Sequence, residues 1–182
     1  MTRLFIALKI PEEIRDTIIK IRNSAVTDPQ KYKWEEKNKI HLTLKFIGEV
    51  SDELIQPIAK QILFIEDFKK FDCKIGKFGF FYKNDKPRIL WLGLSLNPEI
   101  FNLVENLNKE LESFSIPVET KKFKPHLTIK RLKGNEGKEF IKSFKEVNVP
   151  EINFVTSEIS LIKSELFSTG SQFKELKIYN LK

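Results

Sequence analysis

The chain contains only two histidines, and both are followed by the same kind of residues: HLTL begins at His41 and HLTI begins at His126. Apolar and polar residues alternate in both runs, as is typical of a β-strand with one buried face. Residues two positions apart in a strand point to the same side. Each histidine therefore shares a face with its threonine, Thr43 or Thr128, while the intervening leucine turns into the core. A purely structural role for the histidines does not predict the repeated threonine.

Two imidazoles and two hydroxyls on facing strands suit proton transfer at a phosphorus centre. An unperturbed histidine titrates near pH 6.5, so one imidazole can act as a general base while the other, protonated, acts as a general acid. The hydroxyls of Thr43 and Thr128 can donate hydrogen bonds to oxygens that gain negative charge. A zinc site is disfavoured, because neither strand supplies Asp or Glu at an adjacent position on the histidine face.

The elements that position the two motifs form a repeated pattern of strand, helix and strand, which predicts a duplicated α+β unit. We expect one domain covering residues 1–182, with two pseudo-symmetric lobes that carry one motif each. In the first motif strand, Phe46 is expected to share the buried face of Leu42 and Leu44. Expected strands cover residues 3–9, 40–47, 72–82, 88–96, 125–132, 151–163 and 172–179. Helices are expected to begin at Pro11, Asp52 and Asn97 and after Gly137, and residues 117–121 are expected to be extended.

Composition narrows the class of protein. Of the 182 residues, 41% are hydrophobic and 31% charged, which is typical of a soluble globular protein. The single cysteine, Cys73, excludes an internal disulfide framework and a Cys-rich zinc site. No apolar run reaches the ~20 residues of a membrane span, so a reducing cytoplasm is the expected compartment. The net charge of +7 is compatible with an anionic partner but does not require one.

Together these motifs resemble the 2H phosphoesterases, and most closely their RNA 2′,3′-cyclic phosphodiesterase branch, also called 2′-5′ RNA ligase-like. The resemblance covers nearly the whole chain. It includes the opening RLFIAL from Arg3, Trp34 ahead of the first motif, HLTLKFIG from His41, LWL around Trp91, and PHLTIKR ending at Arg131. The paired motifs are its specific part, whereas the opening strand and Trp91 only support it.

The resemblance implies an α+β fold with two lobes, whose antiparallel sheets face a central cleft. It implies hydrolysis of RNA or oligonucleotide 2′,3′-cyclic phosphate ends to 2′-phosphomonoesters, without metal or cofactor, by a monomer. In this interpretation His41 is the proton donor and His126 the proton acceptor, and Thr43 and Thr128 hold the nonbridging oxygens. The same site could also run in reverse and join such an end to a 5′ hydroxyl, although abundant water favours hydrolysis.

Substrate-binding roles are expected for four further residues. Arg131 matches a family position that adds positive charge near the phosphate, but strand parity places it opposite His126 unless a bulge redirects it. Lys130 beside it belongs to a basic run that flanks the motif. Phe5 lies opposite Leu4 and Ile6 in the first strand pattern and can face the site. Trp34 can stack on a base, although an aromatic residue at such a position is more often part of the core.

Two alternatives to an RNA-end hydrolase stay open at this point. One is a module of the same fold that binds RNA or nucleotides without turnover, with the histidines serving only as hydrogen-bond donors. The other is a phosphodiesterase for a different small substrate, such as ADP-ribose cyclic phosphate or 2′,5′-linked oligoadenylate. The intact histidine and threonine pairs argue against the first, and the motifs do not decide on the second.

Overall fold

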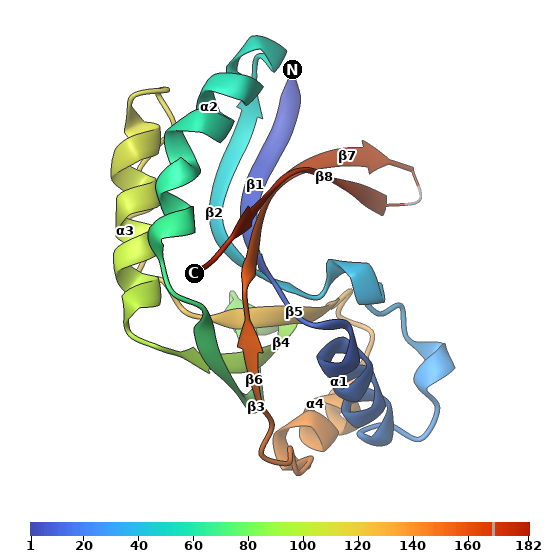
Figure 1. The fold of residues 1–182 in the computed structure, drawn as a ribbon. Coiled ribbons are helices and arrows are strands. Elements are labelled where there is room, and N and C mark those ends of the chain that lie inside the picture. Colours follow the sequence, from blue (N-terminus) through green and yellow to red (C-terminus); the bar gives the residue numbers. More distant parts are fainter. Residues whose placement is uncertain (169) are drawn as a thin grey trace.

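The computed structural model describes residues 1–168 and 170–182, and these residues form two four-stranded antiparallel sheets, called A and B (Figure 1). Sheet A has the strand order β2-β1-β7-β8 and sheet B the order β5-β4-β3-β6. The strands of sheet A are β1 (Thr2–Lys9), β2 (His41–Val50), β7 (Glu158–Phe167) and β8 (Gly170–Asn180). The strands of sheet B are β3 (Phe71–Lys83), β4 (Lys86–Leu96), β5 (His126–Arg131) and β6 (Asn153–Thr156). The predicted α+β fold with two related halves is confirmed.

The helices also lie close to their expected positions. They are α1 (Glu12–Ser24), α2 (Ile55–Gln61), α3 (Glu99–Glu112) and α4 (Gly137–Glu146). The helix expected from Asp52 is divided: a 3₁₀ turn (Asp52–Leu54) precedes α2, and a second one (Ile62–Asp67) follows it. Pro57 lacks the backbone N–H that would join the first turn to the helix, so α2 starts separately. Residues 117–121 are a loop and pair with no strand in the described part of the chain.

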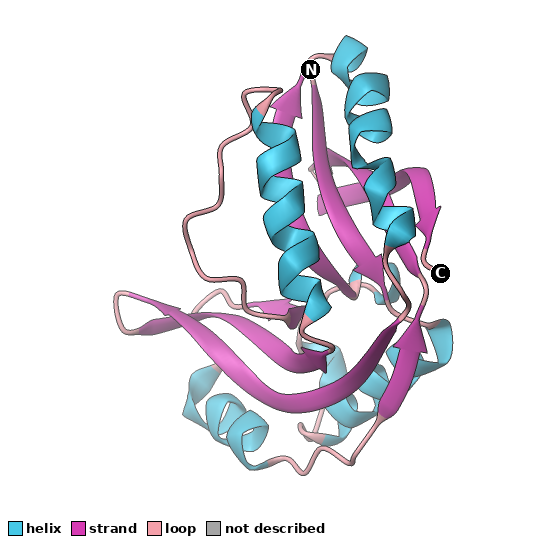
Figure 2. Cartoon of the chain, turned by 60° about the vertical axis from the view of Figure 1, so that its left-hand side comes forward, coloured by secondary structure: helices cyan, strands magenta, loops and turns pink. Residues whose placement is uncertain are grey.

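Each sheet is covered by one helix from each half of the chain. Helix α3 follows β4 of sheet B but packs on sheet A beside α2, where it contacts β2 (Figures 1 and 2). Helix α1 follows β1 of sheet A but lies with α4 beneath sheet B (Figure 1). Arg22 of α1 stacks on Trp34, which in turn contacts Phe140 and Phe144 of α4. The two halves of the duplicated pattern are therefore interlocked through their helices.

The strand expected over residues 151–163 is two strands that belong to different sheets. β6 pairs with β3 in sheet B, and β7 pairs with β1 in sheet A, with Ser157 between them. Two hydrogen bonds fix the chain where it passes from one sheet to the other. Thr156 Oγ1 donates to the Lys9 carbonyl at 2.5 Å, and Leu181 N–H donates to the Ser157 carbonyl at 2.8 Å. Apolar residues stand at even positions before the break (Ile152, Phe154) and at odd positions after it (Ile159, Leu161), with three polar residues between them. This change of parity marks the break, and the prediction of one continuous strand overlooked it.

The strands that carry the two histidine motifs are the edge strands of their sheets and pack next to each other. β2 forms one edge of sheet A and β5 one edge of sheet B, and the two are in contact. The chain leading into β2 is also tied to β5, because Glu35 N–H donates to the Ile129 carbonyl at 3.0 Å. The fold thus brings together two motifs that lie nearly half the sequence apart.

Candidate active site

Both motifs place their side chains as strand alternation predicts. Leu42 and Leu127 are fully buried in the core. His41 and Thr43 lie on the opposite face of sheet A and are half-buried, as are His126 and Thr128 on sheet B. These two surfaces are called the histidine faces below: they are the faces of sheets A and B that carry His41 and His126, respectively. The strands therefore place each histidine and its threonine on the same face, as predicted.

His41 lies against two aromatic rings. Phe5 of β1 stacks on the imidazole with ring centroids 5.1 Å apart, and Phe173 of β8 meets it edge-on at 5.6 Å. Burial among these rings lowers the pKa of His41 to about 4, because a dry apolar surrounding disfavours the charged imidazolium. Phe5 is thus brought to the site as expected. Phe173 was missed, because nothing in its local pattern shows that β8 lies on the same sheet as the first motif.

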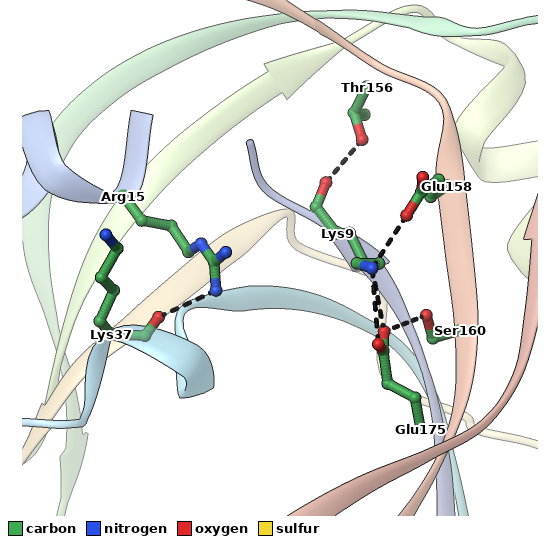
Figure 3. Close-up of polar contacts among 7 residues, drawn as sticks. All are labelled: Lys9, Arg15, Lys37, Thr156, Glu158, Ser160 and Glu175. Atoms are coloured by element: carbon green, nitrogen blue, oxygen red, sulfur yellow. Dashed lines mark hydrogen bonds and ion pairs between the residues drawn. The ribbon is translucent and has the colours of Figure 1, made fainter. Parts of the chain in front are cut away.

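A small network of charges lies beside His41. Lys9 is the cross-strand partner of His41, and its ammonium contacts Glu158 at 2.9 Å and Glu175 at 3.2 Å (Figure 3). Ser160 donates to Glu175 at 2.6 Å. Burial would lower the pKa of Lys9, but the hydrogen bonds to both carboxylates outweigh it and raise that pKa. Lys9 therefore stays charged and holds both carboxylates, a role that its place in the sequence did not suggest.

His126 has a matching but different aromatic surrounding. Phe81 meets the imidazole edge-on with centroids 4.8 Å apart, and Trp91 lies at 6.5 Å. The Lys124 ammonium sits 4.1 Å from the centre of the Trp91 ring. Nδ1 of His126 lies 2.7 Å from the Lys124 carbonyl oxygen. Burial lowers the pKa of His126, the hydrogen bond to the Lys124 backbone raises it, and the Lys124 charge adds to the lowering.

Gly79 allows the Trp91 indole to lie flat on sheet B. The two residues are cross-strand partners, and a Cβ built on Gly79 would come within 2.3 Å of the Trp91 ring. Gly79→Ala is therefore expected to displace the indole from His126 and to destabilise the protein by about 1–3 kcal/mol, as overpacking does. Urea unfolding together with the tryptophan emission spectrum would measure this. An alanine variant with unchanged stability and an unchanged spectrum would contradict the packing described.

A β-bulge redirects the end of the second motif. Thr128 pairs with Trp91 and Lys130 with Leu90, so Ile129 is an extra residue, and both Ile129 and Lys130 are buried. Arg131 consequently returns to the histidine face, where it is exposed and its Nε lies 3.4 Å from Glu35. The bulge that the Arg131 role required is therefore present.

A corresponding bulge in β2 makes one sequence prediction wrong. Thr43 pairs with Ala7 and Lys45 with Ile6, so Leu44 is the extra residue. Lys45 is turned to the buried side, and Phe46 is 69% exposed rather than in the core. Phe46 instead lies 6.2 Å from Phe5 on the histidine face of sheet A.

The structure does not bring Lys130 to the histidine face. Only 4% of its side chain is exposed, and its ammonium lies 3.2 Å from Glu136, which is equally buried, and 3.2 Å from the Lys33 carbonyl. Burial would raise the pKa of Glu136, but hydrogen bonds from the Lys133 backbone, the Lys130 ammonium and the Gly134 backbone lower it. Lys130 therefore ties the second motif to the loop before the first, and the expectation of direct substrate binding fails for a steric reason: the bulge turns this side chain inward.

Trp34 is likewise placed away from both histidines. Its indole packs among Tyr32, Phe140 and Phe144, and Nε1 donates to the Pro29 carbonyl at 2.8 Å. Its other contact is the Arg22 guanidinium, 4.6 Å from the ring centre. Trp34 is therefore part of the core that joins α1 to α4, and the predicted stacking on a base does not fit this position.

A longer repeat is visible once the surroundings are compared. A lysine stands two residues before each histidine and another four residues after it: Lys39 and Lys45 around His41, Lys124 and Lys130 around His126. Both following lysines are buried. Both preceding ones lie over an aromatic ring that contacts the histidine, with Lys39 at 5.9 Å from Phe173. This extended repeat indicates that Lys45 and Lys130 occupy equivalent positions, and the structure shows that both are turned inward.

The part of the chain that the structure describes has neither a metal-binding cluster nor a membrane-spanning helix. Within residues 1–168 and 170–182, no three His, Cys, Asp or Glu side chains are grouped so that they could hold a metal ion. Among the helices in that part of the chain, none is long and apolar enough to cross a membrane.

Comparison with known proteins gives one consistent result. The family described as LigT like Phosphoesterase matches residues 8–91 and 94–171. A Thermotoga maritima protein named RNA 2′,3′-cyclic phosphodiesterase is 30% identical over 96% of this chain and 92% of its own. A Methanocaldococcus jannaschii protein of the same name is 30% identical over 96% of this chain and 98% of its own. The crystal structure of Escherichia coli LigT in apo form has a TM-score of 0.79 at 25% identity, covering 100% of this chain and 98% of LigT.

Proposed function

Since this chain belongs to the LigT-like phosphoesterase family, we propose that it hydrolyses RNA or oligonucleotide 2′,3′-cyclic phosphate ends to 2′-phosphomonoesters. The observation that carries the proposal is the pair of His-x-Thr strands at the adjacent edges of two sheets, each with its imidazole and hydroxyl on one face. The relatives named RNA 2′,3′-cyclic phosphodiesterase support the choice of substrate.

His126 is the general base in this proposal. A carbonyl oxygen can only accept a hydrogen bond, so the contact with the Lys124 carbonyl requires the proton on Nδ1. In the neutral imidazole this leaves Nε2 with a free lone pair. Nε2 can therefore take a proton from the water that attacks phosphorus. The Lys124 backbone acts as the group that fixes the tautomer.

His41 is the general acid. Its lowered pKa makes the imidazolium a strong proton donor once it is formed. A bound phosphate anion favours that charged form, because an opposite charge nearby raises the pKa of a histidine. As the bond from phosphorus to the 3′ oxygen breaks, His41 gives its proton to that oxygen. The products are a free 3′ hydroxyl and a 2′-phosphomonoester.

Thr43, Thr128 and Arg131 bind the phosphate oxygens. Each hydroxyl lies two residues after a catalytic histidine on the same face, where it can donate to a nonbridging oxygen. Arg131 reaches the same face of sheet B through the bulge at Ile129. Its partner Glu35 holds it in the free protein, and a phosphate would compete with that carboxylate for the guanidinium.

The pH dependence of kcat/KM follows from the two lowered histidine pKa values. Above both pKa values the acid is lost, and below both the base is lost, so kcat/KM is maximal between them. Both lie below the ordinary value of 6.5, with that of His41 at about 4. We expect kcat/KM to peak below pH 6.5 and to fall toward pH 8, and kcat to peak at higher pH because bound phosphate favours imidazolium. Rates from pH 4 to 9 would check this, and a kcat/KM maximum above pH 7 would contradict it.

A phosphorus NMR time course tests the proposed function directly. A short RNA ending in a 2′,3′-cyclic phosphate is incubated with the protein and EDTA, and conversion to a 2′-phosphomonoester is expected. No conversion, combined with tight salt-sensitive binding of the same RNA, would favour a non-catalytic binding module instead. A 3′-phosphomonoester product would refute the proposed regiochemistry. Adding an RNA with a 5′ hydroxyl to the same reaction reports whether the reverse ligation occurs.

A further inference from the structure

A hollow of about 520 Å³ lies on sheet B near His126 and is not used by the mechanism above. Its polar lining residues are Asp72, Lys74, Ser95 and Asn153, and its other lining residues are Cys73, Leu96, Phe154 and Val155. Its position relative to the site follows from the strand pairing. Gly93 of β4 is the partner of His126, and Ser95 stands two residues further along β4, so it points to the same histidine face.

Lys74 and Asn153 continue the hollow across the sheet. Ser95 pairs with Lys74 of β3, and Lys74 pairs with Asn153 of β6. The three residues form one row across neighbouring strands, and paired residues share a face. The hollow is therefore an extension of the surface that carries His126, rather than a separate site on another side of the molecule.

Bare backbone connects His126 with this row. Gly93 and Gly76 face each other across β3 and β4, and a Cβ on Gly76 would lie 3.3 Å from the Gly93 backbone. Neither residue has a side chain of its own, so the nearest side chain at Gly93 is the Trp91 ring, which would lie 3.6 Å from a Cβ built there. A chain-like ligand bound at His126 can follow this strip.

The lining suits a nucleotide unit. Ser95 and Asn153 are exposed and offer a hydroxyl and an amide, and the Lys74 side chain is 52% exposed. Glu151 holds this edge in place: it pairs with Lys74 at 3.0 Å and accepts from the Asn153 amide at 3.2 Å. The hydroxyl, the amide and the ammonium can meet the edge of a base, and Leu96, Phe154 and Val155 offer apolar surface to its ring. Because Lys74 is paired with Glu151 and the Asp72 carboxylate lies in the same lining, the hollow suits a base rather than a phosphate. The volume lies within the range of about 300–1,000 Å³ that is usual for ligand pockets.

We propose that this hollow binds the nucleotide on the 5′ side of the terminal one, which makes the enzyme prefer an RNA chain over a mononucleotide. The inference rests on the proposed function. The path from His126 to Lys74 crosses two strand spacings and runs two residues along β4, which places the two residues roughly 12 Å apart. Phe81 and Trp91 lie beside His126, where their rings can pack against the terminal nucleoside, and the hollow then receives the following unit.

Comparison of two substrates tests this. KM is measured for a 2′,3′-cyclic mononucleotide and for the dinucleotide that carries the same terminal base. We expect the dinucleotide to have an about tenfold lower KM, as one or two added hydrogen bonds give. Lys74→Ala, Asn153→Ala and Ser95→Tyr, which fills the hollow, should each reduce this advantage and leave the mononucleotide unchanged. Lys60→Ala, on the exposed side of α2, is the control and should change neither KM.

The outcomes separate this inference from the proposed function. Equal KM values for the two substrates in the unaltered protein, or an advantage that survives all three substitutions, would overturn the inference while leaving the hydrolase intact. An equal loss for both substrates would also overturn it, because the hollow would then hold the terminal base. If neither substrate is hydrolysed, the proposed function fails. In that case, calorimetry would compare the affinities of the two corresponding 2′-phosphorylated products. Tighter binding of the dinucleotide product would support the hollow as a binding site, and equal affinities would overturn it.

Discussion

Replacing His126 or His41 with alanine is expected to lower kcat by roughly 10²–10⁴-fold, which is the usual contribution of one general acid or base. KM should change far less, because the threonine hydroxyls and Arg131 still bind the phosphate. The two histidines act in one proton-transfer step, so the double variant should lose little more than the worse single variant. Single-turnover rates on a short RNA with a cyclic phosphate end would measure all three.

Two controls make this result interpretable. Lys60→Ala should retain full activity, since α2 packs through Ile58 and Ala59 on the core side of sheet A, opposite the face that carries His41. Urea unfolding of each histidine variant would show that the fold persists, which matters most for His41 because its removal opens a space beside Phe5 and Phe173. A folded single variant with a near-normal kcat would refute the paired-histidine mechanism.

Breaking the buried Lys130–Glu136 pair is expected to lower the free energy of unfolding more than any other substitution proposed for this protein. Both side chains are only 4% exposed, so Glu136→Gln leaves the Lys130 charge buried without its counter-ion. Such a change typically costs about 3–5 kcal/mol. The free energy of unfolding from urea titration at pH 7 would measure it. The folded pKa of Glu136 is lowered, so the contribution of the pair is present above its ordinary pKa and is lost as pH falls through the folded value.

A second variant distinguishes charge burial from general damage. Lys130→Met combined with Glu136→Gln removes both charges and should recover most of the stability lost in the single variant. The matched control is Glu105→Gln, which breaks the exposed pair with Lys109 on α3 and should cost less than about 0.5 kcal/mol. A loss below about 1 kcal/mol for Glu136→Gln would show that Lys130 is solvated in solution.

The local sequence was sufficient to predict which side chains are buried wherever strand alternation runs unbroken. It placed Leu42 and Leu127 in the core and set each histidine beside its threonine, because the side-chain period of a strand is two. Alternation was misleading after the bulges. One extra residue at Leu44 moved Phe46 to the surface, and one at Ile129 moved Lys130 inward and Arg131 outward. A bulge depends on the partner strand, which a single segment does not specify.

Long-range arrangement accounts for the remaining differences. Phe173 reaches His41 only because β8 joins sheet A through β7. The polar residues 156–158 separate β6 from β7, but only the partner strands show that the two belong to different sheets. Trp34 likewise packs on α4 rather than near a histidine. In each case the residue type is uninformative until the neighbouring sheet or helix is known. The repeated lysines around both histidines mark Lys45 and Lys130 as equivalent positions, but only the bulges explain why both are buried.

The interlocked helices have a consequence for how such a fold can arise. A single strand–helix–strand unit such as β1, α1 and β2 forms part of one sheet, but its helix covers the other sheet. Alone, that unit would leave the apolar side of its helix without a surface to pack on. The sheet of a second copy would supply that surface, and the helix of the second copy would cover the sheet of the first. The present chain therefore has the geometry of a helix-exchanged dimer whose two subunits are joined end to end, with one histidine in each half.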